Sequence, residues 1–172
     1  HVVDSFSKSV QLGAGLERTG RLSRSSMART IQALRICQQK LKRNNVSRMR
    51  LVATEACRRA LNAEEFIHRV HRETGLRLDI IKPEEEAQLA VISCAPLVSK
   101  RTENLLVVDI GGGSTELVWI DLKAVPKKDR AQSIMRLNRA LSAVRTELPA
   151  ARVVAWISVP LGVATLRDQF VD

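Results

Sequence analysis

With 172 residues, the chain is long enough for one domain of ordinary size or two small ones, and its 45% hydrophobic and 27% charged residues are typical of a globular protein. It has no apolar run of about 18 residues, so no membrane-spanning helix is expected, and no signal peptide is visible. Lys and Arg outnumber Asp and Glu by 28 to 18, and the net charge of +10 favours a polyanionic partner such as nucleic acid, anionic lipid or a phosphate-rich substrate. With three Phe, two Trp and no Tyr, stacking platforms are scarce, which disfavours nucleic acid.

The first predicted elements are an extended segment and a long basic helix. Residues 2–12 read as an edge strand or a strand pair, which a glycine-containing segment ends. Ser23 is suited to cap a helix that runs to about Arg43, with one apolar and one basic face. The apolar face carries Met27, Ile31, Leu34 and Leu41, and the basic face carries Arg29, Arg35, Lys40 and Lys42.

Two further pairs of a strand and a helix follow. Short strands are expected at residues 49–54 and 76–81. The Asn and Glu at the two ends of residues 62–65 predict a capping box that begins a helix, and Gly75 is its expected end. Pro83, followed by three glutamates, begins another helix. The alternation of strands and helices predicts an α/β fold.

The second half of the chain is predicted to contain three strands and two helices. A polar, irregular segment at residues 96–103 reads as a linker between two lobes. The strands are expected at 104–110, 114–121 and 151–158, and the helices at 125–149 and from about 163 onward. The 125–149 helix has an apolar stripe and many basic residues. This pattern favours packing on the protein's own core, with a dimer contact or a rail for a long polyanion as alternatives.

Residues 109–117, DIGGGSTEL, place three consecutive glycines between two strands. No lysine follows the glycines, which excludes a Walker loop, and a strand instead of a helix follows them, which excludes a dinucleotide-binding turn. The glycines therefore belong to a hairpin. Two interpretations remain: a plain flexible hairpin, or a loop whose glycines adopt positive φ and direct backbone N–H groups at an anion. The flanking acids and hydroxyl favour the second, because carboxylates suit a hydrated Mg²⁺ beside a phosphate.

The loop and three other segments resemble the family of exopolyphosphatases and guanosine pentaphosphate phosphatases, in the superfamily of actin and the sugar kinases. DIGGGSTEL resembles the second phosphate motif of that family. VATEACRRALNAEEF resembles its A-T-x-x-x-R-x-A-x-N segment, TGLRLDIIKPEEEAQLA its stretch ending in E-E-A, and SVPLGVATLRDQF its S-x-P-x-G block. The resemblance implies an actin-like (ribonuclease H-like) two-lobed α/β fold with a mixed sheet and flanking helices, incomplete here. Residues 1–102 would belong to the first lobe and residues 103–172 would begin the second.

The resemblance also implies roles for individual residues. Glu86 would be the catalytic acid that polarises the attacking water, and Arg58 would bind phosphate. Gly111, Gly112, Gly113 and Ser114 would bind phosphate through the loop, and Asp109 and Glu116 would hold the metal, Mg²⁺. From the residues alone, Glu86 also reads as a helix-start acid that the helix dipole stabilises, and Arg58 as a solvated surface charge beside Arg59.

The activity that this resemblance implies is hydrolysis of the terminal phosphate of polyphosphate by a cytoplasmic, homodimeric parent protein. Guanosine pentaphosphate 5′-phosphatase activity, or a catalytically silent polyphosphate- or nucleotide-binding module, are the alternatives. The first phosphate loop of the family, D-x-G-S-N-S, does not occur in the chain. The strands that would carry it, and most of the second lobe, are therefore expected to be missing, and the chain alone is expected to be inactive.

The remaining candidate residues are cysteines and histidines. Cys37, Cys57 and Cys94 are odd in number and far apart in sequence, which predicts core residues instead of a disulfide framework or a zinc site. His68 and His71 have a spacing that could bind a metal, but no acid or Cys accompanies them, and exposed side chains are expected.

Overall fold

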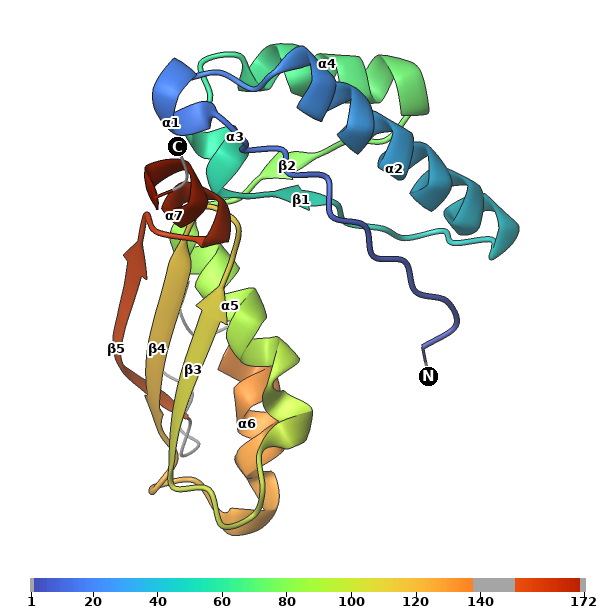
Figure 1. The fold of residues 1–172 in the computed structure, drawn as a ribbon. Helices are drawn as coiled ribbons and strands as arrows, with labels where there is room; N and C mark the ends of the chain where they lie inside the picture. The colour runs from blue at the N-terminus through green and yellow to red at the C-terminus, as the bar shows by residue number, and fades with distance from the viewer. Residues whose placement is uncertain (1, 138–150, 171–172) are drawn as a thin grey trace.

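The computed structural model describes residues 2–137 and 151–170, which form two packed bodies (Figure 1). The first body contains the following elements in chain order: α1 (Leu16–Thr19), α2 (Arg24–Arg43), β1 (Val52–Ala53), α3 (Glu55–Arg59), α4 (Ala63–Thr74) and β2 (Asp79–Ile80). β1 and β2 pair in parallel, with Val52 opposite Asp79. The core lies between α2 and α4, where Phe66 and Val70 pack with Met27 and Ile31.

The second body is an antiparallel sheet with helices on one face. Its elements are α5 (Pro83–Ser93), β3 (Asn104–Ile110), β4 (Thr115–Asp121), α6 (Arg130–Arg136), β5 (Arg152–Val159) and α7 (Val163–Phe170), with short 3₁₀ turns at Ala95–Leu97 and Lys127–Asp129. The strand order is β3-β4-β5. Ala87 and Val91 of α5 pack with Val107 and Val118 of the sheet. Parallel and antiparallel pairs with flanking helices confirm the predicted α/β class.

Local signals in the sequence placed most helices correctly. The Ser23 side chain accepts a hydrogen bond from the backbone N–H of Ser26 and caps α2 at its predicted start. Pro83 begins α5, and Gly75 ends α4 with a φ of 70°. The predicted strands at 49–54 and 76–81 exist but are reduced to the two-residue β1 and β2.

The strand prediction for residues 2–12 is wrong. These residues carry no strand; instead, side chains and carbonyls of the segment contact α2. The Asp4 carboxylate pairs with Lys40 Nζ at 2.7 Å and Arg43 Nη2 at 3.1 Å, and Arg29 Nε donates to the Val10 carbonyl at 3.3 Å. A β-ladder needs a neighbouring strand, and the composition of residues 2–12 does not show whether one lies beside them.

The capping box at Asn62 is also wrong. The buried Asn62 side chain accepts from the Leu22 backbone N–H at 2.8 Å and donates to the Leu22 carbonyl at 3.1 Å. It therefore ties the loop before α2 to the start of α4 instead of capping α4. Of the predicted 125–149 helix, the structure contains α6, with Ile134 buried in the core, and residues 138–150 lie outside the described residues.

Two features of this fold position the site described next. The hairpin between β3 and β4 ends beside α3 of the first body, and α7 lies across the same end of the sheet (Figure 1).

On the sheet face away from α5, the side chains of Leu106, Val108, Ile110, Trp119 and Ile157 are exposed.

Candidate active site

The three glycines form the turn of the β3–β4 hairpin, as the sequence predicted. Ile110 pairs with Thr115, and the Gly111 N–H donates to the Ser114 carbonyl at 2.8 Å. The expected positive φ angles are not found: among the described glycines, only Gly15, Gly20 and Gly75 have them. The reason for glycine here is space, because a Cβ on Gly113 would lie 3.0 Å from the Glu55 Cγ.

Backbone N–H groups at the start of α7 hold the loop by donating to the loop's carbonyl groups. The Val163 N–H donates to the Gly111 carbonyl at 3.0 Å, and the Ala164 N–H donates to the Gly112 carbonyl at 2.7 Å. The Thr115 hydroxyl donates to the Leu161 carbonyl at 2.6 Å from the other side. Within residues 2–137 and 151–170, the N–H groups of Gly112 and Gly113 have no hydrogen-bond partner. The loop is thus held in place through its carbonyl oxygens, and the N–H groups of Gly112 and Gly113 are available to a ligand.

Gly162 allows this close approach. A Cβ at Gly162 would lie 2.5 Å from the Gly112 carbonyl carbon and 2.6 Å from the Gly111 oxygen, distances that real Cβ atoms do not reach. Gly162, the glycine of the S-x-P-x-G block, therefore lets α7 pack directly on the glycine loop.

Two acids of the loop motif lie opposite each other on adjacent strands. Asp109 of β3 pairs in register with Glu116 of β4, and Glu116 pairs with Ser158 of β5. Side chains of directly opposed residues have Cβ atoms about 4.5–5.5 Å apart and share one sheet face. Asp109 and Glu116 lie on the sheet face that packs against α5. Val107 and Val118, each two positions away on the same strand, are in the core on that face, and side chains two positions apart in a strand share a face.

Glu116 is 1% exposed, and only one of its carboxylate oxygens is satisfied. Ser158 Oγ donates to Glu116 Oε1 at 2.8 Å, whereas Oε2 is buried without a hydrogen-bond partner among the described residues. An unpaired buried carboxylate oxygen is costly, and a cation or a further donor at this atom would satisfy it.

The donor set fits Mg²⁺. Mg²⁺ commonly takes one or two carboxylates from the protein and completes its shell with water and substrate phosphate. Half-buried Asp109 lies opposite Glu116 in the strand register, and the glycines of the loop follow it directly in the chain. No group of three or more His, Cys, Asp or Glu side chains suited to a metal occurs in the described part of the chain, which excludes a closed, all-protein site there.

Arg58 joins the two bodies at Glu86. Its Nη1 donates to Glu86 Oε2 at 2.8 Å and to the Ile81 carbonyl at 2.9 Å, and the side chain is 15% exposed. The interpretation of Arg58 as a solvated charge is therefore wrong. The Glu86 side chain is similarly shielded, with 14% of it exposed. It lies in the first turn of α5, and the Arg58 guanidinium from α3 holds its carboxylate.

Burial raises the pKa of Glu86 above its usual value of 4.5, and the negative charge of Glu116 raises it further. Arg58 opposes both effects, but the net shift of the Glu86 pKa is upward. The Arg58 pKa is raised, because its hydrogen bonds to Glu86 and Glu55 outweigh the effect of burial. A carboxyl group with a raised pKa that also faces a second carboxylate is typical of a general base or of a metal-assisted site.

Space for a ligand adjoins the loop. A cavity of about 590 Å³ is lined by Gly112, Gly113, Thr54, Glu55 and residues of α7, among others. A more open cleft of about 460 Å³, which Glu55, Trp156 and Ser158 help to line, lies on the β5 side. Gly112 and Gly113, whose N–H groups have no partner among the described residues, therefore line a cavity beside the loop.

Comparison with known proteins now assigns the family. The model of the Ppx/GppA phosphatase family matches residues 1–172. The chain belongs to this family. The crystal structure of the Aquifex aeolicus member of the Ppx/GppA family is 34% identical, with a TM-score of 0.62 over 94% of this chain and 43% of that one.

Two further solved structures are similar in fold. An exopolyphosphatase-like protein is 26% identical, with a TM-score of 0.77 over 98% of this chain and 47% of its own. An exopolyphosphatase from Cytophaga hutchinsonii is 22% identical, with a TM-score of 0.72 over 94% of this chain and 43% of its own, a likeness in fold only. The chain thus spans less than half the length of these solved Ppx/GppA relatives, and the expected incomplete actin-like α/β fold is confirmed. The lobe boundary at residues 102 and 103 stays a prediction.

The structure brings all the predicted site residues together. Asp109, the loop 111–114 and Glu116 lie at one sheet end, and Arg58 and Glu86 approach it from α3 and α5. The proposed roles stay predictions. Arg58 is already heavily engaged: Nη1 makes two hydrogen bonds and Nε and Nη2 one each, so one of its five N–H groups remains.

Sequence reasoning missed Glu55, Ser158 and Gly162. Ser158 and Gly162 were noticed only as parts of a motif, and their contacts are with residues 42 or more positions away. Glu55 could have been found, because it lies three residues before Arg58 on a predicted helix start, a spacing at which opposite charges pair.

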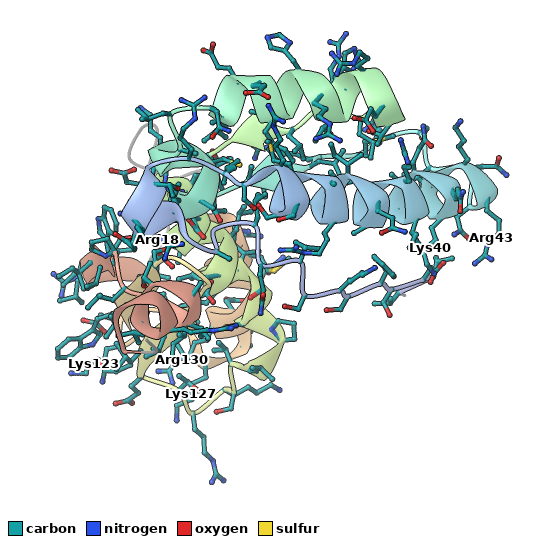
Figure 2. The ribbon with its side chains drawn as sticks, turned by 45° about the horizontal axis from the view of Figure 1, so that its top comes forward. Arg18, Lys40, Arg43, Lys123, Lys127 and Arg130 are labelled. Carbon is teal, nitrogen blue, oxygen red and sulfur yellow. The ribbon has the colours of Figure 1, made fainter. Side chains whose placement is uncertain are left out.

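The remaining candidates do not form sites. Of the three cysteines predicted to be core residues, Cys57 is buried in the core, whereas Cys37 and Cys94 are half-buried free thiols. His68 and His71 are exposed, as predicted. Figure 2 shows the basic side chains of Lys40 and Arg43 at one end of α2, far from Lys123 and Lys127. The net charge is therefore spread over the molecule. No helix within the described residues is both long and apolar enough to cross a membrane.

Proposed function

We propose that the site cleaves the terminal phosphoanhydride bond of polyphosphate by attack of water. The observation that carries the proposal is a pair of carboxylates, Glu116 buried and Glu86 half-buried, beside a loop whose Gly112 and Gly113 N–H groups have no partner among the described residues. Glu86 is held by Arg58 and has a raised pKa, and Glu116 has one oxygen without a partner. Such a pair suits two different tasks, proton transfer and cation binding.

Each residue then has a defined task. Glu86 orients a water and accepts its proton while the water oxygen bonds to the terminal phosphorus and the bridging P–O bond breaks, which releases orthophosphate and a chain shorter by one unit. The N–H groups of Gly112 and Gly113 take up negative charge on the terminal phosphate. Asp109 and Glu116 would hold Mg²⁺, which supplies charge neutralisation on the phosphate oxygens when bound.

The experiment compares two glutamates of the same helix turn. In a protein of the relatives' full length that carries this sequence, Glu86→Gln should abolish Mg²⁺-dependent phosphate release from long-chain polyphosphate and leave polyphosphate binding nearly unchanged. Glu84→Gln is the matched control, because Glu84 is exposed in the same first turn of α5 and should retain activity. Equal loss of turnover and binding in Glu86→Gln would make Glu86 a structural acid and refute the proposal.

The same assay on guanosine pentaphosphate decides between the two substrates, which no described residue separates. For the 172-residue chain alone, we propose no turnover, since the relatives are more than twice as long. Measurable phosphate release by the purified chain would contradict this. The cytoplasmic location and the homodimer stay predictions.

A further inference from the structure

Glu55 lies at the centre of the site without an assigned role. Its Oε2 accepts hydrogen bonds from Arg58 Nε at 3.1 Å and from Arg58 Nη2 at 2.8 Å, and its side chain is 14% exposed. Its Oε1 lies 3.8 Å from Arg59 Nε. The aliphatic part of the side chain lies next to the loop at Gly113, where an added Cβ would come within 3.0 Å of the Glu55 Cγ. Glu55 therefore contacts the loop with its stem and Arg58 with its carboxylate.

The carboxylates of Glu55 and Glu86 accept hydrogen bonds from different N–H groups of the Arg58 guanidinium. Glu55 takes the Nε and Nη2 edge of Arg58, and Glu86 takes Nη1, which the Ile81 carbonyl also shares. A guanidinium is planar, so fixing one edge fixes the direction in which the other edge points. Without Glu55, only Nη1 of Arg58 would keep hydrogen bonds within the described residues, and the plane could turn about them.

We propose that Glu55 is a positioning residue: by binding one edge of Arg58, it fixes the guanidinium so that Nη1 orients the carboxylate of Glu86. Because the stem of Glu55 rests on Gly113, the same side chain ties this orientation to the position of the phosphate loop. Glu55 does not touch the reacting atoms. Its effect on turnover rests on the proposed function, whereas its effect on Arg58 does not.

The first experiment tests the geometry on the 172-residue chain and needs no activity. Hydrogen exchange of the Arg58 Nε–H, followed by ¹⁵N NMR, should be slow in the wild type and markedly faster in Glu55→Ala. Glu17→Ala is the matched control, since Glu17 binds the neighbouring Arg59 through Nη1 and, at 2.8 Å, through Nη2. It should remove both hydrogen bonds of Arg59 to Glu17, leave Arg59 only its 3.8 Å contact with Glu55, and leave Arg58 unchanged. Equal exchange at Arg58 in the wild type and Glu55→Ala would overturn the proposal.

The second experiment measures kinetics in the full-length protein. Glu55→Ala should lower kcat by about tenfold to a hundredfold, the range that a small misplacement of a catalytic group produces, with little change in KM. Glu55→Gln keeps an oxygen that can accept from Arg58 and should recover part of kcat. A loss confined to KM would assign Glu55 to substrate binding and refute the positioning role. If NMR shows Arg58 released but no variant, including the wild type, hydrolyses polyphosphate, the proposed function fails and the role of Glu55 stands.

Discussion

Replacing Gly162 by alanine is the sharpest test of how α7 holds the loop. The added Cβ would lie 2.5 Å from both the Gly112 carbonyl carbon and the Gly113 nitrogen, and ordinary contact begins at 3.4 Å, so backbone must move by 3.4 − 2.5 = 0.9 Å. Both neighbours are main-chain atoms, so no side chain can rotate away. Overpacking of this kind costs about 1–3 kcal/mol.

The assay is thermal unfolding of the purified chain, followed by circular dichroism. At about 2–4 °C per kcal/mol for a chain of this size, Gly162→Ala should lower Tm by about 2–12 °C. Gly112→Ala is the control on the same contact, because a Cβ there meets nothing within 4 Å, and its Tm should stay within about 1 °C of the wild type. If both variants unfold at the wild-type temperature, α7 does not sit on the loop as described.

Three further outcomes follow from the contacts of single residues. Ser158→Ala removes the hydrogen bond that Glu116 Oε1 accepts, leaves the carboxylate without a hydrogen-bond partner among the described residues, and should cost about 1–3 kcal/mol, part of which added Mg²⁺ should restore in the same thermal assay. Glu86 must be ionised to accept a proton, and burial raises its pKa above 4.5. The kcat of the full-length protein should therefore fall as pH drops through a midpoint above 4.5. A pH–rate profile with a lower midpoint would contradict this. Burial also raises the pKa of Cys57 to about 11, so the folded chain should resist alkylation at Cys57 by iodoacetamide at pH 8, as mass spectrometry of the peptides can show; rapid labelling would contradict the buried position.

The sequence predicted the elements whose signals are local. The Ser23 cap, Pro83 at the start of α5 and the alternation in β4 each depend on neighbouring residues only, and each agrees with the structure. The errors concern partners that are distant in the chain. A strand at residues 2–12 needs a neighbouring strand, and the amide of Asn62 has a better partner in Leu22, 40 residues away.

The site shows the same division. The motif identified Asp109, Glu116 and the glycines, and the resemblance added Arg58 and Glu86. Neither showed why Gly113 must be glycine, because the reason is the side chain of Glu55 on another body of the molecule. The orphaned oxygen of Glu116 is likewise a property of packing, since it depends on which donors the surrounding strands present.

The central claim is that a water held by Glu86 attacks the terminal phosphorus, and hydrolysis in H₂¹⁸O tests it directly. With the full-length protein, Mg²⁺ and polyphosphate in a single-turnover reaction, the first orthophosphate released from each chain should carry one ¹⁸O atom by mass spectrometry, and Glu86→Gln should release orthophosphate far more slowly. A first orthophosphate without ¹⁸O, with the label left on the shortened chain, would place the attack on the neighbouring phosphorus, and release by Glu86→Gln at the wild-type rate would remove Glu86 from the reaction.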